Sequence, residues 1–401
     1  MTDPNVSHSN NKHSASLAAA SAQKIAIIGG GLSGLFTATL LEQAFATAPK
    51  NLQITIFEKS RSVGRLATRY RTDKSTDKNW QWSFGAQFFT AKSESFKQFI
   101  APDLHSGLLQ PWLAKVVNLT SASESGQSPQ IEPKEQWDSI HARYISTPKM
   151  TSWGRKLADD LQFTTIKFKT RVAPLAQYSH LQTDKRTELF DEKGESLGLF
   201  DWVICTAPNG QAAELMADSG FTQQGKILKP EMLACYTLML GWQDDVKLPD
   251  SLKSQANEPV SNWDVAFIQG SILDRVFIEH HKPNHEQLLP SLTIHANNQW
   301  SQQQVDQDIT KITEQLLAEA KQLLNWREQT APTQIDCHRW RYASTLTPLD
   351  IEGNEQPLGI LVDKDKQWLV SGDWCAQGNI ESCYQVAEQT VGVILEAVST
   401  N

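Results

Sequence analysis

The sequence has few cysteines and no long apolar run. Its five cysteines are spread over 401 residues, none of them in a C-x-x-C pair, and their number is odd. This pattern gives no indication of a disulfide framework and favours a protein of the reducing cytoplasm. No stretch reaches the roughly 18 uninterrupted apolar residues that predict a membrane-spanning helix. We therefore expect neither a disulfide-stabilised secreted protein nor a membrane protein.

An excess of basic charge is also lacking. The chain has 37 Lys and Arg against 45 Asp and Glu, a formal net charge of −8, which argues against nonspecific binding of nucleic acid. Residues 1–22 are rich in Ser, Asn and Ala but lack the basic start and the apolar core of a secretory signal. We predict a disordered tail there, followed by a globular chain long enough for two domains.

The most informative stretch is KIAIIGGGLSGLFTA, residues 24–38. Its short apolar run predicts a buried parallel strand. Gly29, Gly31 and Gly34 follow in the spacing G-x-G-x-x-G, and residues 32–45 then have the apolar spacing of a helix. A glycine pattern alone is weak, but a preceding strand and a following helix make it typical of a dinucleotide-binding domain.

Each part of this motif has a role in binding a dinucleotide. Gly29 permits the turn from strand to helix, Gly31 lets a diphosphate approach the backbone, and Gly34 allows the helix to pack closely on the strand. The free N–H groups at the helix start hold the diphosphate. A second predicted strand, residues 53–58, ends in Glu58, which we expect to accept hydrogen bonds from ribose hydroxyls.

Two further segments have compositions that suit a bound cofactor. Residues 59–69 form a short segment rich in basic and small residues, and Arg65 is a candidate partner for phosphate. The alternative is that this segment is a solvated basic loop. Residues 70–80 are polar and predict a loop. In residues 80–90, Gly85-Ala86 would admit a flat ring, while the aromatic residues either line that pocket or belong to a core.

With these residues the chain resembles the renalase family of FAD-dependent oxidoreductases, within the amine-oxidase-like flavoproteins. The resemblance covers nearly the whole chain from residue 24 onward. The chain departs from the family pattern in having only Gly64 where members usually carry two glycines, and Ser83-Phe84 where members often have Asp-His. The matching blocks are Ile25–Gly34, Glu58–Arg61, Gly64–Arg69, Gly85–Thr90, Lys149-Met150, His338–Tyr342 and Gly372-Asp373.

The resemblance implies an α/β fold with a Rossmann-type FAD-binding domain built from discontinuous segments, and a second α+β substrate domain containing an antiparallel sheet. The FAD-binding domain would comprise residues 23–70, 150–205 and 345–401. The substrate domain would comprise residues 71–149 and 206–344.

Periodicity and composition place elements within these segments. The apolar patterns predict strands over 163–172, 202–208, 232–242, 265–268, 275–278, 291–295 and 368–373, with a final helix over 381–398. Residues 118–136 are rich in Ser, Glu, Gln and Pro and predict a loop or insertion. Ser301–Gln304 resembles a capping box before a structural helix that reaches Leu324.

The resemblance also implies the residues that hold FAD. Val172 would contact the adenine through its backbone, Asp373 would meet the ribityl–diphosphate region, and a helix starting near Ile380 would direct its amino end at flavin N1 and O2. We expect FAD to be noncovalent, because the chain has no obvious Cys or His attachment motif. The predicted cofactor residues are Gly29, Gly31, Ser33, Gly34, Glu58, Lys59, Gly64, Arg65, Gln87, Phe88, Val172, Gly372, Asp373 and Ile380.

The substrate residues are less defined. Arg339 and Arg341 alternate with aromatic residues, and they either bind a charged dinucleotide or clamp the domain interface. The sequence assigns no general base. Four histidines between residues 280 and 295 have no repeated ligand spacing, so we expect no metal site. The pocket candidates are Gln87, Phe88, Arg339, Arg341 and Trp374.

These observations predict a flavoprotein that accepts a hydride at flavin N5 from a small-molecule substrate. The resemblance implies oxidation of isomeric dihydroNAD(P) to NAD(P), with O2 reoxidising the flavin. An amine oxidase acting on a small amine is the alternative, and an FAD-binding sensing or structural protein with little turnover is another. We expect no nucleic-acid or membrane partner, and a monomer or dimer.

Overall fold

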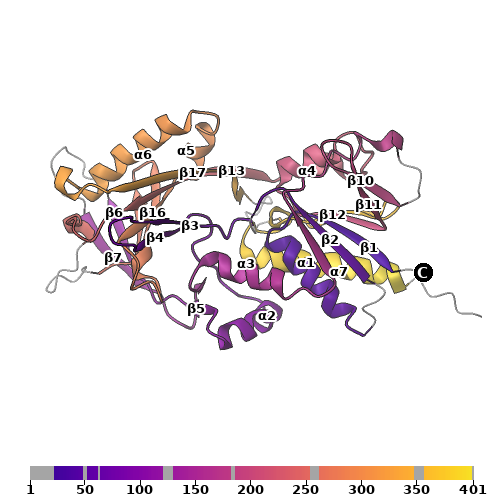
Figure 1. The fold of residues 1–401 in the computed structure, drawn as a ribbon, viewed down its shortest axis with the longest axis horizontal. Helices are drawn as coiled ribbons and strands as arrows, with labels where there is room; N and C mark the ends of the chain where they lie inside the picture. Colours follow the sequence, from indigo (N-terminus) through magenta and orange to yellow (C-terminus); the bar gives the residue numbers. More distant parts are fainter. Residues whose placement is uncertain are drawn as a thin grey trace, which may run out of the picture.

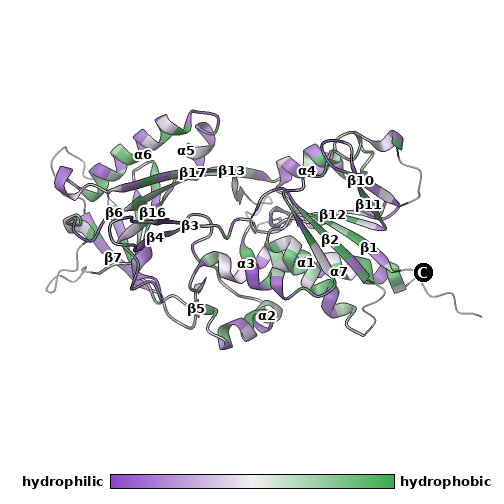
Figure 2. Cartoon of the chain, in the orientation of Figure 1, coloured by the Kyte–Doolittle hydropathy of each residue, from purple (hydrophilic) through white to green (hydrophobic). Residues whose placement is uncertain are grey.

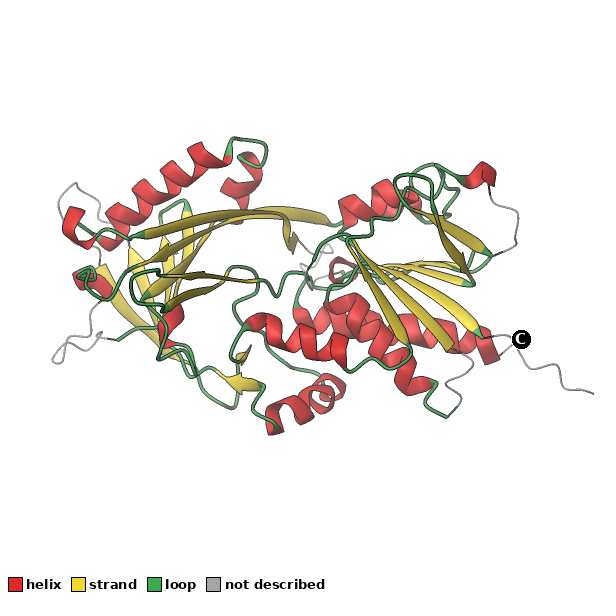
Figure 3. Cartoon of the chain, viewed as in Figure 1, coloured by secondary structure: helices red, strands yellow, loops and turns green. Residues whose placement is uncertain are grey.

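The computed structural model describes residues 22–47, 52–61, 64–120, 130–181, 186–252, 262–346 and 356–399. The chain forms two lobes joined by several crossing segments (Figure 1). The tail predicted over 1–22 lies outside the described residues except for its last residue. One lobe contains the first strand of the chain and the last helix, and the other contains a large antiparallel region (Figure 3).

The first lobe is built on a six-stranded sheet in the order β18-β19-β12-β1-β2-β9. β1 pairs in parallel with β2 and β12, and the parallel pairing continues to β9 and β19, while β18 is antiparallel at the edge. The bounds are β1 Gln23–Ile28, β2 Leu52–Glu58, β9 Thr164–Phe168, β12 Trp202–Cys205, β18 Leu361–Asp363 and β19 Trp368–Val370.

Both faces of this sheet are covered, which explains why its central strands read as continuous apolar runs. Ile25 and Ile27 pack with one face's helices, and Ala26 packs with the hairpin on the other face. Figure 2 shows β1 and β2 as largely hydrophobic. The covering elements are α1 Leu32–Ala44, α3 Met150–Asp159 and α7 Ile380–Ser399 on one face, and β10 Thr187–Phe190, β11 Ser196–Phe200 and α4 Asn209–Met216 on the other (Figure 1).

The second lobe contains a seven-stranded sheet in the order β17-β13-β16-β15-β14-β6-β7. Leu238 and Ile294 on one face form a core with α6 residues such as Leu316. The residues that alternate with these face the other way, where Met239 packs in a core with Trp80 and Trp82. The bounds are β6 Lys115–Thr120, β7 Gln130–Gln136, β13 Glu231–Gly241, β14 Val265–Gln269, β15 Leu273–Ile278, β16 Ser291–Ala296, β17 Gln334–Leu346, α5 Asn298–Gln303 and α6 Ile309–Leu324.

Short elements connect the lobes. A hairpin of β3 and β4 lies against the seven-stranded sheet, where Trp80 and Trp82 donate to the carbonyls of Trp242 and Leu240, both at 2.9 Å. These two aromatic residues therefore belong to a core. The bounds are β3 Thr68–Thr72, β4 Asn79–Ser83, α2 Glu94–His105, β5 Leu109–Pro111 and β8 Tyr144–Ser146.

The structure confirms the α/β fold class and the antiparallel pairing of β14, β15 and β16. Three local predictions were wrong. Residues 70–80 are not one loop but most of the β3–β4 hairpin, and residues 118–120 and 130–136 form paired strands. Ser301 lies inside the separate helix α5, whereas α6 starts at Ile309 because the side chain of Asp308 accepts from the N–H groups of Thr310 and Lys311.

Within the described residues, no helix combines the length and the apolar character needed to cross a bilayer. The same part of the chain holds no group of three or more His, Cys, Asp or Glu side chains arranged to bind a metal ion.

Candidate functional site

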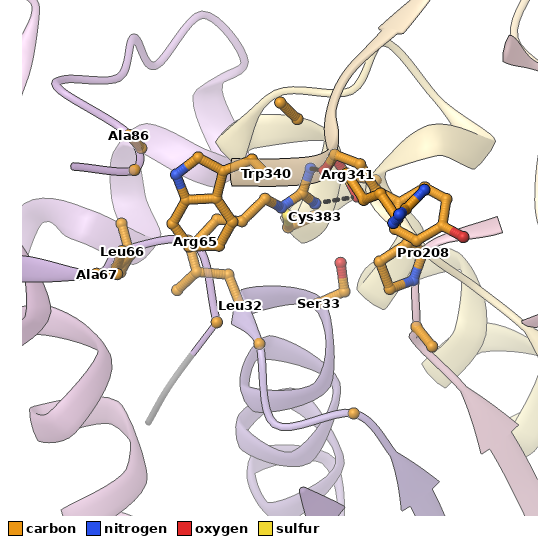
Figure 4. A pocket seen from close by; sticks show the side chains of 18 of the residues that line it. Leu32, Ser33, Arg65, Leu66, Ala67, Ala86, Pro208, Trp340, Arg341 and Cys383 are labelled. Atoms are coloured by element: carbon orange, nitrogen blue, oxygen red, sulfur yellow. Dashed lines mark hydrogen bonds and ion pairs between the residues drawn. The ribbon is translucent and has the colours of Figure 1, made fainter. Parts of the chain in front are cut away.

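A continuous cavity of about 950 Å³ runs between the two lobes. It begins at the carboxyl ends of β1 and β2, passes the amino ends of α1 and α7, and ends on the seven-stranded sheet. Its volume is at the upper end of the range for cofactor and ligand sites. Figure 4 shows its middle part, where Arg65 lies between Trp340 and Arg341 above the start of α1.

The glycine motif forms the turn at the first end of this cavity. Gly29 has φ +121°, and a Cβ there would lie 2.6 Å from Oγ1 of Thr206. A Cβ on Gly34 would lie 2.1 Å from the carbonyl oxygen of Gly29, so helix and strand touch at this point. At Gly31, by contrast, a Cβ would meet nothing within 4 Å, and Gly31 lines the cavity. The backbone of Gly29–Gly31 thus faces the open cavity without side chains, and we call this turn the glycine cradle.

The helix that follows adds hydrogen-bond donors to this cradle. Gly31 is the residue before α1, and no side chain caps the helix. The first N–H groups of a helix have no partner within it, and the helix dipole is positive there. Leu32 and Ser33 also line the cavity. This arrangement fits a diphosphate.

Glu58 lies beside the glycine turn, buried at the end of β2. One carboxylate oxygen accepts from the N–H of Gly30 at 2.8 Å, and the other accepts from the N–H of Ser60 at 2.7 Å. A carboxylate has about four acceptor positions, so each oxygen can accept a further hydrogen bond from a ribose hydroxyl in the cavity. Lys59 and Val172 line the same region.

An ion pair and a second helix end form the middle of the cavity. Arg65 donates to Asp373 at 2.5 Å and to the carbonyl of Tyr342 at 3.3 Å. Ile380 starts α7 and lines the cavity, so a second positive helix end faces the same space. A Cβ on Gly64 would lie 3.0 Å from Cα of Gly31, which shows how closely this segment covers the glycine turn.

Small apolar residues border the space beyond the ion pair. Leu66, Ala67 and Ala86 lie on the same side of Figure 4 as the indole of Trp340. A Cβ on Gly85 would be 2.0 Å from the carbonyl oxygen of Arg65, so a side chain there would push the two segments apart. Small side chains on this wall leave room beside it for an aromatic ring system.

Aromatic residues continue this wall toward the seven-stranded sheet. Phe84 stacks on Trp340 with ring centroids 5.4 Å apart and an interplanar angle of 22°, and the His338 imidazole contacts both rings edge-on. Burial, followed by the charges of Arg69 and Arg339, lowers the pKa of His338 to about 4, so its imidazole is neutral at pH 7.

Gln87 and Phe88 both line the cavity, and residues behind the cavity wall fix the positions of their side chains. The side-chain oxygen of Gln87 accepts from Lys282 at 2.7 Å, and Lys282 forms a buried ion pair with Glu279 at 2.8 Å. Phe88 packs edge-on against Trp137, with ring centroids 4.7 Å apart. Gln87 is therefore positioned by a buried polar network that the sequence did not reveal.

Three candidates lie outside the cavity wall. Trp374 is buried and donates to the carbonyl of Ala207 at 3.0 Å. A Cβ on Gly372 would lie 2.3 Å from its indole nitrogen, so this glycine makes room for Trp374. Arg339 donates to the carbonyl of Val305 at 2.7 Å and holds the α5–α6 connection within the second lobe. In this structure Trp374 and Arg339 are thus placed beside the cavity and not in its wall.

Arg341 does line the cavity and pairs with Asp306 at 2.7 Å. Sequence reasoning missed Thr237, Arg275 and His295, which also line it. Their strands were predicted, but the faces on which these side chains lie were not. The order in which the strands pair, which brings these residues together, had no local signal.

Two family models match the chain. Residues 27–101 match the NAD(P)-binding Rossmann-like domain, and residues 150–395 match the flavin-containing amine oxidoreductases. The second match covers more than half of the chain. This protein belongs to the flavin-containing amine oxidoreductase family. As a member of this family it is an FAD-dependent oxidoreductase, and the glycine cradle, Glu58 and the two helix ends fit that cofactor.

Solved structures share the fold of this flavin-containing amine oxidoreductase at low identity. A protein from Exiguobacterium sp. 255-15 that is assigned as a protoporphyrinogen oxidase is 12% identical, with a TM-score of 0.65 over 93% of this chain and 99% of that one. Cyclohexylamine oxidase from Brevibacterium oxydans IH-35A is 11% identical, with a TM-score of 0.64 over 94% and 100% of the two chains. Putrescine oxidase bound to putrescine is 11% identical, with a TM-score of 0.62 over 93% and 99%.

Proposed function

We propose that this protein oxidises a dihydronicotinamide dinucleotide to NAD(P), as its resemblance to the renalases implies. The observation that carries the proposal is the wall at the substrate end of the cavity, where the flat Phe84–Trp340 stack lies among guanidinium groups. Arg275 and Arg341 line this end together with the neutral imidazole of His338. The guanidinium groups attract phosphates and repel an ammonium group, and the aromatic stack suits a planar base.

When bound, FAD would supply a two-electron acceptor at its N5 position, which O2 can reoxidise. The substrate ring loses a hydride and becomes an aromatic pyridinium. Because this C–H bond breaks without removal of a separate proton, the chain needs no general base. The protein's own part is to bind and orient the substrate and to exclude water.

Residues of the chain stabilise the charge that develops in the cavity. The positive amino end of α7, at Ile380, faces the cavity and favours negative charge there. His338 stays neutral at pH 7, so it offers a hydrogen bond without adding a positive charge beside the forming pyridinium. The Phe84–Trp340 stack provides a surface on which a flat ring can lie.

Oxidation of a small amine is the second candidate function. It is favoured by the family match and by the fold likeness to cyclohexylamine oxidase and putrescine oxidase. Aromatic residues beside the cofactor space, Phe84 and Trp340, suit an apolar amine as well.

The deciding experiment is anaerobic reduction of the purified flavoprotein, followed by loss of the visible flavin absorption. The panel contains 2-dihydro- and 6-dihydroNAD(P), ordinary NAD(P)H, cyclohexylamine and putrescine. We expect fast bleaching by the isomeric dihydronucleotides only. Bleaching by amines alone would replace the proposal with amine oxidation, and an absence of bleaching by any compound would support a sensing or structural role.

We expect Arg341→Met to raise KM for the dinucleotide about tenfold, because a charge-assisted hydrogen bond to phosphate is lost. Arg339→Met is the matched control. It lies two residues away on β17 and also holds the α5–α6 connection, but it does not line the cavity. Arg339→Met should lower the free energy of unfolding by about 1 kcal/mol and leave KM unchanged. Steady-state kinetics and urea unfolding measure both effects, and equal KM values would remove Arg341 from the substrate site.

We also propose that FAD is bound noncovalently. Cys235 and Cys383 line the cavity, and burial raises the pKa of each thiol to about 12, so both are protonated and poorly nucleophilic at pH 7. Acid precipitation should therefore release all of the flavin into the supernatant, as measured by its absorption. Flavin that stays with the precipitated chain would contradict this prediction.

A further inference from the structure

A row of side chains crosses the seven-stranded sheet at the substrate end of the cavity. Arg275 on β15 is directly opposite His295 on β16, His295 is opposite Thr237 on β13, and Thr237 is opposite His338 on β17. Directly opposite residues in neighbouring strands point to the same face of a sheet. All four residues line the cavity, and the helices α5 and α6 cover the other face. The sheet thus presents one continuous polar row to the substrate.

The two halves of this row differ in how their polar groups are satisfied. Thr237 donates to the carbonyl of Phe84 at 3.1 Å, and His338 contacts the Phe84 and Trp340 rings. In the part of the chain that the structure describes, the Nε2 atom of His295 is buried without a hydrogen-bond partner, whereas the Nε atom of Arg275 is buried with only an ion-pair contact to Asp274. A buried polar atom without a partner, such as His295 Nε2, is rare in native structures, because it loses its bond to water and gains nothing in return.

Both side chains are nevertheless held in place by their surroundings. The guanidinium of Arg275 lies over the Phe267 ring, 4.9 Å from its centroid, and the ring of Phe277 contacts the His295 imidazole edge-on at 5.2 Å. The imidazole and the guanidinium are therefore fixed groups, as expected of a preorganised binding subsite.

The charges of this subsite balance. Oδ2 of Asp274 lies 3.1 Å from Nε of Arg275 and offsets its positive charge. Burial, followed by the charges of Arg275 and Lys282, lowers the pKa of His295 to about 3, so its imidazole is neutral. A neutral imidazole has one donor nitrogen and one acceptor nitrogen, and a guanidinium has donors only. The pair thus suits a neutral ligand group that both accepts and donates.

We propose that Arg275 and His295 form a subsite that binds the primary carboxamide of the substrate ring. The carboxamide oxygen accepts from the guanidinium, and its NH2 group donates to the acceptor nitrogen of the imidazole. A carboxylate has no donor for the imidazole and is repelled by Asp274, and a methyl ketone likewise lacks the donor. This inference rests on the proposed function, because dihydronicotinamides carry this group whereas simple alkylamines do not.

The test is calorimetric binding of three small probes to the flavin-loaded protein: nicotinamide, nicotinate and 3-acetylpyridine. We expect the wild-type protein to bind nicotinamide about tenfold more tightly than either of the others, since each mismatch leaves a hydrogen-bonding group unpaired. His295→Phe should bind nicotinamide and 3-acetylpyridine equally, and His295→Gln, which keeps an acceptor, should restore part of the preference. Arg275→Met should weaken binding of both probes.

The control is His281→Asn, a change outside the cavity wall at a side chain that contacts Asp264. It should keep the wild-type preference, and flavin content will show that every variant is folded. A preference for nicotinate, or a preference for nicotinamide that survives in His295→Phe, overturns the subsite. The bleaching experiment separates the two proposals: bleaching by dihydroNAD(P) without a carboxamide preference rejects this subsite alone, and a carboxamide preference without bleaching rejects the proposed reaction alone.

Discussion

Replacing Gly31 by valine is expected to abolish FAD binding while leaving the fold intact. A Cβ at this position meets no protein atom within 4 Å, so the valine side chain enters the open space of the cavity without straining the chain. That space lies at the uncapped start of α1, where a diphosphate would approach the backbone. A steric cost of about 3 kcal/mol corresponds to a loss of affinity of about 100-fold or more.

The ratio of flavin to protein after purification measures this effect, and thermal unfolding of the flavin-free protein measures the fold. Gly225→Val is the matched control, because a Cβ there also meets nothing within 4 Å and Gly225 is not part of the cavity wall. It should purify with the wild-type flavin content. Gly34→Val should instead fail to fold, because its Cβ would lie 2.1 Å from the carbonyl oxygen of Gly29. A fully yellow Gly31→Val protein would reject the diphosphate cradle.

The contrast between Gly31 and His295 shows which parts of the site can be predicted from sequence. The glycine turn is encoded within one short segment, since the strand, the turn and the helix start are neighbours along the chain. The requirement for small residues follows from that local geometry alone. The polar row depends on which strands become neighbours in the seven-stranded sheet, and residues far apart in sequence, such as His295 and His338, are brought together only by that order.

The local errors have a similar origin. Polar residues 70–80 predict a loop, but tertiary packing of Trp80 and Trp82 on the sheet makes most of the segment a hairpin. The Ser301–Gln304 pattern fits a capping box, yet Asp308 supplies the cap of α6 because its carboxylate accepts two backbone N–H groups at the actual helix start. Arg339 and Arg341 are equivalent in sequence, and only the structure shows that one lines the cavity and the other does not.

The second large effect is expected for Arg65→Met, which leaves the carboxylate of Asp373 without its partner. The side chain of Asp373 is 6% exposed and that of Arg65 is 32% exposed, with the guanidinium lying in the cavity shown in Figure 4. Because removing one partner of a buried pair leaves an uncompensated charge, we expect the flavin-free protein to lose about 2–3 kcal/mol of unfolding free energy. Urea unfolding of the flavin-free protein measures this loss.

The double variant Arg65→Met/Asp373→Asn separates folding from cofactor binding. Removing the unpaired charge should return most of the lost unfolding free energy, since an amide needs no counter-charge. If Arg65 pairs with the diphosphate, FAD affinity should stay low, because its guanidinium is still missing. Asp373→Asn alone keeps that guanidinium and should bind FAD at least about tenfold more tightly than the double variant. If Asp373→Asn and the double variant bound FAD equally, Arg65 would serve only to neutralise Asp373, and the diphosphate would be held by the start of α1 without it.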